Sequence, residues 1–286
     1  MKTCNYYVTL RCNDTCEFCP IWQDENLKKI EEKSFGLNQL KKLNVSTLNI
    51  TGGEPLLRID LPQILKQAKE TGFKVNLTTN GILLGEKVGL LGGLVDGLMV
   101  SLDYPTAEMH DRSRGVECFN EVIDGIKLAK NSGLAPIINF TMTRDSVLYL
   151  PEMIDLAETL RVFIQLLPVY DNFGTQGFAE ETIKHIKYYS RRRNVLLNLA
   201  LLDLVKNKGN KTLWPRCRAS QTTVTILPDG RQVSPCFFNQ EGREGRADIC
   251  SSCMRFSYML PSFSHGFDKY YWLNKYSNYL NRRKMK

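Results

Sequence analysis

The sequence predicts an α/β fold: a parallel sheet curved into a partial barrel of six strand–helix units, followed by a small domain with a β-hairpin and a helix. Three observations support this. Short apolar, β-branched segments alternate with longer helical patterns up to about residue 170. Six strands are too few for the closed eightfold barrel. A linker-like stretch then precedes hairpin and helix patterns. We therefore expect a barrel domain at 1–206 and the small domain at 207–286.

The six strand candidates are short segments rich in β-branched and aromatic residues. They are residues 6–10, 46–50, 74–79, 97–102, 136–142 and 162–169. Between the second and third, residues 60–72 place four apolar side chains on one helical face. Alternation of this kind favours βαβ units, whose strands are parallel. In such folds the reactive residues gather in the loops after the carboxyl ends of the strands.

The second half of the chain has a different pattern. Residues 179–206 are charged and predicted to be helical, and residues 207–216 are typical of a linker. Residues 222–236 contain two strand-like runs around a Pro-Asp-Gly turn, which predicts a hairpin. Residues 268–286 end the sequence with a helical pattern rich in aromatic and basic side chains.

The composition indicates a globular cytoplasmic protein. The hydrophobic fraction of 43% supports a core of ordinary size, and no apolar run approaches the roughly 18 residues of a membrane span. The amino terminus lacks the apolar segment of a signal peptide. Nine cysteines, an odd and clustered set, fit metal ligation in a reducing compartment better than a disulfide framework.

The net charge of +8 is concentrated in residues 206–286, which hold 15 Lys or Arg and 5 Asp or Glu. An excess of this kind can indicate an anionic partner. We favour the interpretation that part of it offsets the charge of thiolate-bound metal. Trp272, Tyr276 and Tyr279 share a helical face near the basic end. Contact with anionic lipid or nucleic acid is one interpretation, but we favour a helix that docks this aromatic face on the core.

The first motif is a group of three cysteines, Cys12, Cys16 and Cys19, within eight positions. Three thiolates can bind three irons of a [4Fe–4S] cubane and leave the fourth iron without a protein ligand. An open coordination position allows a metal centre to bind and activate another molecule. A zinc site with a fourth ligand from elsewhere is the alternative. It is less favoured, because none of the three histidines belongs to a helix-borne zinc motif.

The second motif, "ITGGEPLL", follows the second predicted strand. Gly52 and Gly53 allow the backbone to approach a ligand closely, and Pro55 stiffens the exit from the turn. Glu54 provides a carboxylate suited to an ammonium group. On its own, a Gly-Gly turn of this kind is equally well explained by local structure.

Together the two motifs resemble the radical S-adenosylmethionine (SAM) superfamily. The resemblance extends through "TTNG" (78–81), "SLD" (101–103), "HDRSRG" (110–115) and "IQLLP" (164–168). It implies a [4Fe–4S] cluster on the three cysteines, with SAM chelating the open iron through its amino and carboxylate groups. An electron from a donor such as flavodoxin or ferredoxin would cleave SAM to a 5′-deoxyadenosyl radical, which abstracts hydrogen from a substrate.

The resemblance also implies which residues surround SAM. Gly52, Gly53 and Glu54 would hold its ammonium group, and either Arg112 or Arg114 would reach its carboxylate. The remaining expected contacts, with the adenine, ribose and carboxylate, are Phe18, Thr79, Asn80, Ser101, Asp103, Gln165, Leu167 and Pro168. For each polar residue, ordinary loop capping is the alternative.

A third group of cysteines lies near the predicted hairpin: Cys217, Cys236, Cys250 and Cys253. Four thiols complete a site, and from the residues alone zinc and iron–sulfur are equal interpretations. Beside a radical SAM core, the segment resembles a Twitch domain, the shortened SPASM extension, with one auxiliary [4Fe–4S] cluster. It departs from the SPASM spacing, with five residues instead of four between Gly230 and Cys236. A fully ligated cluster favours electron transfer and hints at net substrate oxidation.

Few other residues suggest chemistry. Cys118 follows the fourth strand's loop; a small buried side chain is a better explanation than a hydrogen donor. Tyr104, Tyr170 and Asp171 follow strand ends, where packing is the default role. Cys4 has no predicted function.

The predicted substrate is an unidentified small molecule or a peptide. The core begins almost at residue 1 and leaves no room for an amino-terminal peptide-recognition domain, so a peptide would need a separate partner. Short one-cluster relatives include sugar-alcohol dehydrogenases. The molybdopterin-pathway cyclase has three auxiliary cysteines, so the four here argue against it. A non-catalytic zinc or redox-sensing binding module is the alternative from another class, but it would not need Gly52–Pro55, Ser101 and Asp103.

Overall fold

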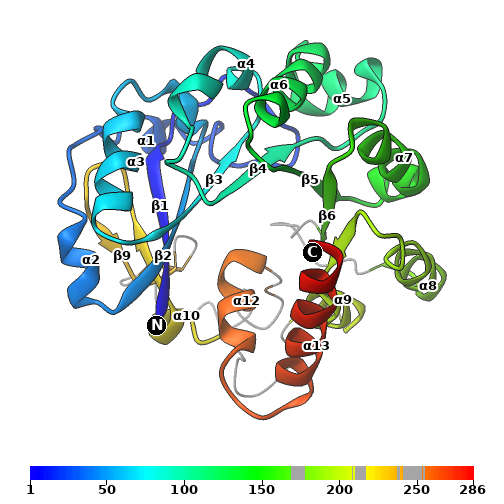
Figure 1. Ribbon diagram of the computed structural model, residues 1–286. Helices are drawn as coiled ribbons and strands as arrows, with labels where there is room; N and C mark the ends of the chain where they lie inside the picture. Colours follow the sequence, from blue (N-terminus) through cyan, green and yellow to red (C-terminus); the bar gives the residue numbers. More distant parts are fainter. Residues whose placement is uncertain (169–177, 208, 210–216, 237–238, 241–252, 254) are drawn as a thin grey trace.

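The structure is a computed structural model that describes residues 1–168, 178–207, 209, 217–236, 239–240, 253 and 255–286. Nine strands form one sheet in the order β7-β6-β5-β4-β3-β2-β1-β8-β9 (Figure 1). All neighbours are parallel except β8 and β9. The strands are β1 (Lys2–Thr9), β2 (Val45–Gly52), β3 (Lys74–Thr79), β4 (Gly97–Ser101), β5 (Pro136–Met142), β6 (Phe163–Pro168), β7 (Val195–Leu197), β8 (Thr223–Ile226) and β9 (Gln232–Val233).

Helices cover the convex side of the sheet and occupy its opening. They are α1 (Glu25–Lys28), α2 (Asn38–Lys42), α3 (Leu61–Glu70), α4 (Leu84–Lys87), α5 (Ala107–Arg114), α6 (Phe119–Asn131), α7 (Leu150–Leu160), α8 (Glu180–Tyr189), α9 (Leu199–Lys206), α10 (Ala219–Thr222), α12 (Phe256–Phe263) and α13 (Lys269–Lys284). Short 3₁₀ turns are η1 (Pro55–Leu57), η2 (Val88–Leu90) and η3 (Ser146–Tyr149), and β10 (Pro235–Cys236) pairs with β11 (Asn239–Gln240). Helices α12 and α13 lie in the opening of the curved sheet (Figure 1).

The predicted mixed α/β fold with a parallel sheet is confirmed. All six predicted strands are present as β1–β6, and each neighbours the next in the sheet. The prediction of continuous helix over 179–206 is wrong at β7, which pairs with β6. Its three apolar residues are too few to distinguish a strand from a helix by periodicity. Within the described residues the sheet is open, and β7 and β9 are its two edges.

The hairpin predicted at 222–236 is present as β8 and β9, and it extends the main sheet. Strand β8 pairs in parallel with β1, with Asn5 opposite Thr225. The division into domains at residues 206 and 207 stays a prediction. In the described residues, α13 packs on α9 across that boundary.

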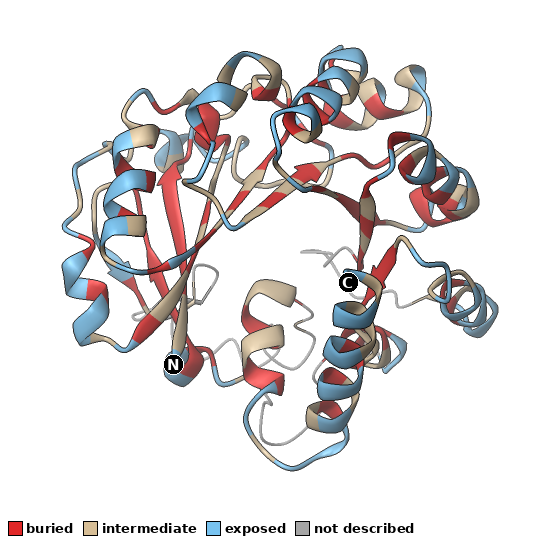
Figure 2. Cartoon of the chain, viewed as in Figure 1, coloured by how far each residue is buried: buried red, intermediate tan, exposed pale blue. Residues whose placement is uncertain are grey.

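The two faces of the sheet differ in chemistry. Buried residues alternate with less buried ones along strands such as β3 and β4 (Figure 2). Leu48, Ile50 and Val100 belong to the main apolar core under α3, α6 and α7. The opposite, concave face carries polar side chains, because successive side chains of a strand point to opposite faces. Asn49 donates to Asn5 Oδ1 over 3.1 Å, and Asn76 donates to Asn49 Oδ1 over 3.0 Å.

Helix α13 docks through polar residues, so the favoured prediction that its aromatic face contacts the core is wrong. Asn274 Oδ1 accepts from Asn198 Nδ2 at 2.7 Å, and Ser277 Oγ accepts from the Leu199 N–H at 2.8 Å. Asn281 Nδ2 donates to the Leu197 carbonyl at 3.1 Å. Backbone groups at the junction of β7 and α9 need partners when covered, and these side chains supply them. The aromatic residues Trp272, Tyr276 and Tyr279 remain 59%, 54% and 57% exposed.

Within the part of the chain that the structure describes, no helix combines the length and the apolar character that crossing a membrane would require.

Candidate active site

The three cysteines lie on the loop that leaves β1, and this loop is tied to the end of α5. The Thr15 N–H donates to the Arg114 carbonyl over 2.9 Å, and the Glu17 N–H donates to the Ser113 carbonyl over 3.2 Å. Trp22 Nε1 donates to the Cys16 carbonyl over 2.8 Å. The loop therefore has a defined backbone held by contacts distant in sequence.

Cys12, Cys16 and Cys19 lie close enough to influence one another electrostatically. Burial, together with negative charges nearby that include Cys19, raises the pKa of Cys12 to about 12. Burial also raises the pKa of Cys16 and Cys19. Such thiols become thiolates only beside a strong positive charge, and a metal centre provides one. Among the described residues no three His, Cys, Asp or Glu side chains converge as ligands of one ion would. A cubane that takes one thiolate per iron does not need that convergence.

Gly52 and Gly53 of the second motif allow the end of β2 to pack closely against the start of the cysteine loop. The Gly53 N–H donates to the Thr9 carbonyl over 2.9 Å, and the Glu54 N–H donates to the Arg11 carbonyl over 2.8 Å. A Cβ atom on Gly52 would lie 2.1 Å from the Thr9 oxygen, and one on Gly53 would lie 2.0 Å from the Arg11 oxygen. Close backbone packing thus explains both glycines, while their predicted contact with SAM stays a prediction.

Glu54 is fully buried and joins the loops that follow β2 and β3. Its Oε1 accepts from the Leu56 N–H at 2.9 Å and from Thr79 Oγ1 at 2.7 Å, and its Oε2 accepts from the Asn80 N–H at 2.6 Å. Burial raises the pKa of Glu54 to about 7, although these donors oppose the rise. Asn80 extends the network by donating from Nδ2 to Asn13 Oδ1 over 2.8 Å. Glu54, Thr79 and Asn80 therefore form one hydrogen-bond network, and their contacts with SAM stay a prediction.

Arg114 forms the electrostatic centre of the site and is only 5% exposed. Its Nη2 forms a short ion pair with Asp103, and its Nη1 lies 3.5 Å from both Asp14 Oδ2 and Cys16 Sγ. Burial alone would lower the pKa of Arg114, but Asp103, Cys16 and Asp14 outweigh it and raise the pKa. The guanidinium also lies over the Phe18 ring, 5.6 Å from its centroid. A permanent positive charge therefore sits beside one of the three thiols.

The structure distinguishes the two candidate arginines. Arg112 is exposed on α5, whereas Arg114 at the end of the same helix points into the site. The next residue, Gly115, has φ of 72°, and a Cβ atom there would lie 2.1 Å from Thr15 Oγ1. This glycine ends α5 where the cysteine loop crosses it.

Two buried residues at this centre were not predicted. Asp14 lies between the first two cysteines, and burial raises its pKa. His110 Nδ1 accepts from the Asp103 N–H at 3.3 Å, and burial, followed by the charge of Arg114, lowers the pKa of His110 to about 3. Asp14 Oδ1 and His110 Nε2 have no hydrogen-bond partner among the described residues. Asp14 could have been predicted as a site residue from its position inside the cysteine motif.

The concave face adds a row of polar residues across β4, β5 and β6. Ser101, Asn139 and Gln165 are in register. Asn139 is 8% exposed, and its Oδ1 has no partner among the described residues. The sequence analysis missed Asn139, although it alternates with the apolar residues of β5. Gln165 and Leu167 also line a cavity of about 130 Å³ closed by α9, α12 and α13 residues, and Pro168 is buried at the end of β6.

The second group of cysteines lies only partly within the described residues. Cys217 and Cys236 pack against one apolar cluster that includes Tyr7 and Leu10 from β1 and its loop. Ile21, which follows the third cysteine of the first motif, packs against the same cluster. Cys253 is described and half-buried, and Cys250 lies outside the described residues.

Of the remaining candidate residues, some lie within the described part of the chain and some outside it. Cys118 is buried at the start of α6, and burial raises its pKa to about 12, as suits a packed side chain. Tyr104 packs edge-on against Tyr149, with ring centroids 5.8 Å apart. Tyr170 and Asp171 lie outside the described residues.

Comparison with known proteins decides the family. Residues 6–161 match the family described as the Radical SAM superfamily, which is more than half of the chain and includes the cysteine loop and the Gly-Gly-Glu turn. The chain belongs to the radical SAM superfamily. Its expected assignment as a radical SAM enzyme is thereby confirmed.

Curated relatives with similar sequences carry one name. The chain is 30% identical over 267 residues to a probable GTP 3′,8-cyclase of Sulfurisphaera tokodaii, covering 83% of this chain and 82% of that protein. It is 29% identical over 268 residues to a probable GTP 3′,8-cyclase of Sulfolobus acidocaldarius, covering 86% and 84%.

Solved structures share the fold at lower identity. The Streptococcus suis protein SuiB bound to S-adenosylmethionine has a TM-score of 0.64 and 18% identity, covering 90% of this chain. This chain spans 63% of the length of that SuiB chain. Native anSMEcpe with bound AdoMet has a TM-score of 0.63 and 15% identity, covering 96% of this chain and 88% of that one. At these identities the likeness concerns the fold alone.

Proposed function

We propose that this radical SAM enzyme binds a [4Fe–4S] cluster through Cys12, Cys16 and Cys19 and abstracts hydrogen from an unidentified small molecule or peptide. The observation that carries the proposal is the group of three electrostatically coupled thiols on one anchored loop, beside the buried Arg114. When bound, such a cluster supplies the electron that cleaves SAM to methionine and a 5′-deoxyadenosyl radical.

In this proposal the chain's own residues bind and orient SAM and neutralise negative charge at the cysteine loop. The Arg114 guanidinium offsets negative charge at Cys16 and is fixed by Asp103 and Asp14. Glu54 accepts hydrogen bonds that hold the loop after β2 against the loop after β3. In the proposed arrangement, SAM lies against the turn of Gly52–Glu54 and against Phe18, and Ser101, Asn139 and Gln165 offer polar contacts on the concave face.

An auxiliary [4Fe–4S] cluster on Cys217, Cys236, Cys250 and Cys253 completes the proposal. Cys217 and Cys236 share an apolar cluster with residues on both sides of the first cysteine loop, which supports electron transfer between the two sites. A cytoplasmic location and a flavodoxin- or ferredoxin-type electron donor belong to the same proposal. A peptide substrate delivered by a separate partner is a variant of it.

GTP cyclisation is the second candidate, because relatives at about 30% identity carry that name. Two observations oppose it. Four cysteines are available for the second site instead of three. A triphosphate needs several cations, and the concave positions of β1–β6 provide one, Lys74 at the amino end of β3, so the others would have to come from loops or from the basic residues of 206–286.

The experiment is anaerobic reconstitution followed by iron and sulfide determination, reduction, and assay of 5′-deoxyadenosine from SAM. About eight irons with SAM cleavage supports two cubanes, and about four irons with cleavage removes the auxiliary cluster from the proposal. The Cys16→Ala variant should lose SAM cleavage. The Cys236→Ala variant should lose about half of the iron but retain SAM cleavage. GTP consumption would establish the second candidate. A fully loaded protein that cleaves no SAM would favour a zinc or redox-sensing binding module.

A further inference from the structure

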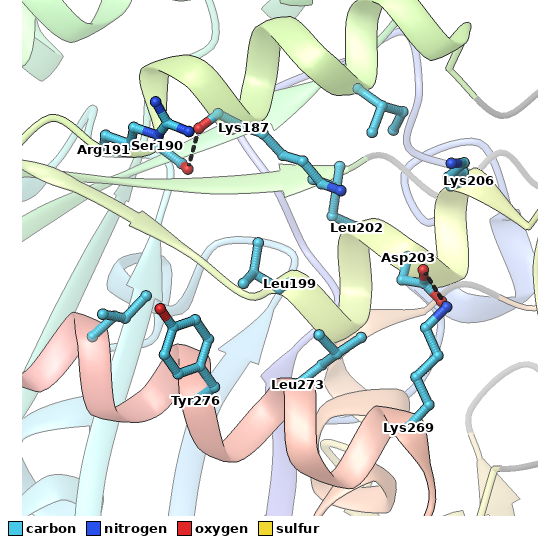
Figure 3. A pocket seen from close by; sticks show the side chains of 12 residues that line it. Lys187, Ser190, Arg191, Leu199, Leu202, Asp203, Lys206, Lys269, Leu273 and Tyr276 are labelled. Atoms are coloured by element: carbon cyan, nitrogen blue, oxygen red, sulfur yellow. Dashed lines mark hydrogen bonds and ion pairs between the residues drawn. The ribbon is translucent and has the colours of Figure 1, made fainter.

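A groove between α8, α9 and α13 lies outside the site described above (Figure 3). It has a volume of about 520 Å³. Its apolar lining comes from all three helices: Ile183, Leu199, Leu202, Leu273 and Leu280. In Figure 3, α9 forms the floor between the α8 and α13 walls. The groove is therefore an apolar channel flanked by two helices.

The charge around this groove is predominantly positive. Lys187 on α8, Arg191 just after α8, Lys206 on α9 and Lys269 on α13 line it, with Asp203 as the single lining carboxylate. Lys269 Nζ is already 2.7 Å from Asp203 Oδ1, and Lys206 lies 4.0 Å from Glu180. Neither Lys187 nor Arg191 has a carboxylate partner among the residues that the structure describes. The α8 wall therefore favours an anionic occupant.

The exposed face of α13 continues this surface. Tyr276 lines the groove, and Trp272 and Tyr279 share its exposed helical face. The Arg283 guanidinium lies 5.8 Å from the Tyr279 ring centroid. Trp, Tyr and Arg are the residue types that most often dominate binding at protein interfaces. Trp272, Tyr276 and Tyr279 are more than half exposed, and no described element covers them.

We propose that this groove binds an acidic amphipathic helix of a partner polypeptide. Two flanking helices over an apolar floor are the geometry in which a third helix packs, with apolar side chains at i, i+3 or i+4, and i+7 on the floor. Asp or Glu side chains beside that stripe would pair with Lys187 and Arg191, and its end would contact Tyr276.

Other anionic partners fit this surface less well. A nucleic acid offers phosphates and stacking bases but no side chains for a leucine-lined floor. A bilayer surface cannot enter a groove between helices. The inference is independent of the cluster chemistry proposed above, because none of the groove residues belongs to that site.

The test measures binding of fluorescein-labelled synthetic helices to the reconstituted full-length protein by fluorescence anisotropy. The acidic probe carries a leucine stripe and glutamates on the remaining face. One control replaces every glutamate by lysine, and a second keeps the composition but scrambles the leucine stripe. The variant Lys187→Glu/Arg191→Glu reverses the α8 wall, and Lys42→Glu/Lys66→Glu is its control on exposed lysines of α2 and α3.

We expect the acidic probe to bind saturably. Its affinity should fall at least about tenfold for the Lys187→Glu/Arg191→Glu variant and for Tyr276→Ala, but not for the Lys42→Glu/Lys66→Glu control. Higher salt should weaken it, and both peptide controls should bind at least about tenfold more weakly. Equal affinity for all variants, equal binding of the scrambled probe, or no saturable binding would overturn the proposal. So would binding of oligo-dT or of phosphatidylserine vesicles that depends on the same residues in the absence of acidic-peptide binding.

Discussion

Replacing Arg114 by methionine tests the electrostatic centre of the site. The change removes a guanidinium that is 5% exposed and leaves Asp103 and Asp14, 1% and 2% exposed, without their cation. Breaking one partner of a buried ion pair costs about 3–5 kcal/mol, because a buried charge is left uncompensated. For 286 residues the entropy of unfolding near Tm is about 0.6 kcal/mol/K, so this cost corresponds to a fall in Tm of roughly 5–8 °C.

The assay is thermal unfolding of the anaerobically reconstituted protein, with Arg112→Met as the matched control. Arg112 lies two residues before Arg114 on the same helix and is exposed, so its replacement should change the free energy of unfolding by about 0.5 kcal/mol or less. A deficit in Arg114→Met no larger than in Arg112→Met would refute the reasoning.

The pH dependence of the Arg114→Met deficit adds a second readout. Burial already raises the pKa of Asp14, and Arg114 opposes that rise, so without the cation the folded-state pKa of Asp14 lies further above the unfolded value of about 3.9. The folded variant then binds more protons than the unfolded chain, so its stability falls as pH rises through that interval. The deficit relative to the natural protein should therefore be smaller at pH 5 than at pH 8. A deficit independent of pH would show that lost packing, and not charge, is its cause.

Three further predictions concern residues around the centre. Gly53→Ala should lose at least about half of its iron, because the new Cβ would lie 2.0 Å from the Arg11 oxygen, whereas Gly89→Ala, with nothing within 4 Å, should keep it; equal iron contents would contradict this. Glu54 has a folded pKa of about 7 against 4.5 in the unfolded chain, so the natural protein should lose stability between pH 4.5 and 7, and Glu54→Gln, compared by denaturant titration, should lack that slope; parallel curves would refute it. Cys118→Ala should retain 5′-deoxyadenosine formation, since the thiol is buried with a pKa of about 12, and loss of product in a stable variant would restore the hydrogen-donor role.

Structural features that depend only on neighbouring residues along the chain could be predicted from the sequence. Strands β1–β6 are visible as apolar, β-branched segments because alternation of side chains is a local property. The cysteine spacing of residues 12–19 is a local property too, and so is the Gly-Gly-Glu-Pro turn. These features were enough to identify the superfamily that the comparison confirmed.

Tertiary structure decided which side chains meet. Either Arg112 or Arg114 satisfied the sequence pattern, but only Arg114 lies on the side of α5 that faces the cysteine loop. Asp14 became important only because that loop folds against α5. Hydrogen bonds between residues 11 and 100 positions apart leave no periodic signal in the sequence.

The same limit explains the error at α13. Its aromatic stripe suggested burial by hydrophobicity, yet the backbone groups of Leu197 and Leu199 required hydrogen-bond partners, and Asn281 and Ser277 met that need. These backbone groups lie at the end of β7 and the start of α9, a junction that the sequence pattern did not reveal. Which face of a helix is buried thus depends on the surface it meets, and that surface exists only once the sheet has formed.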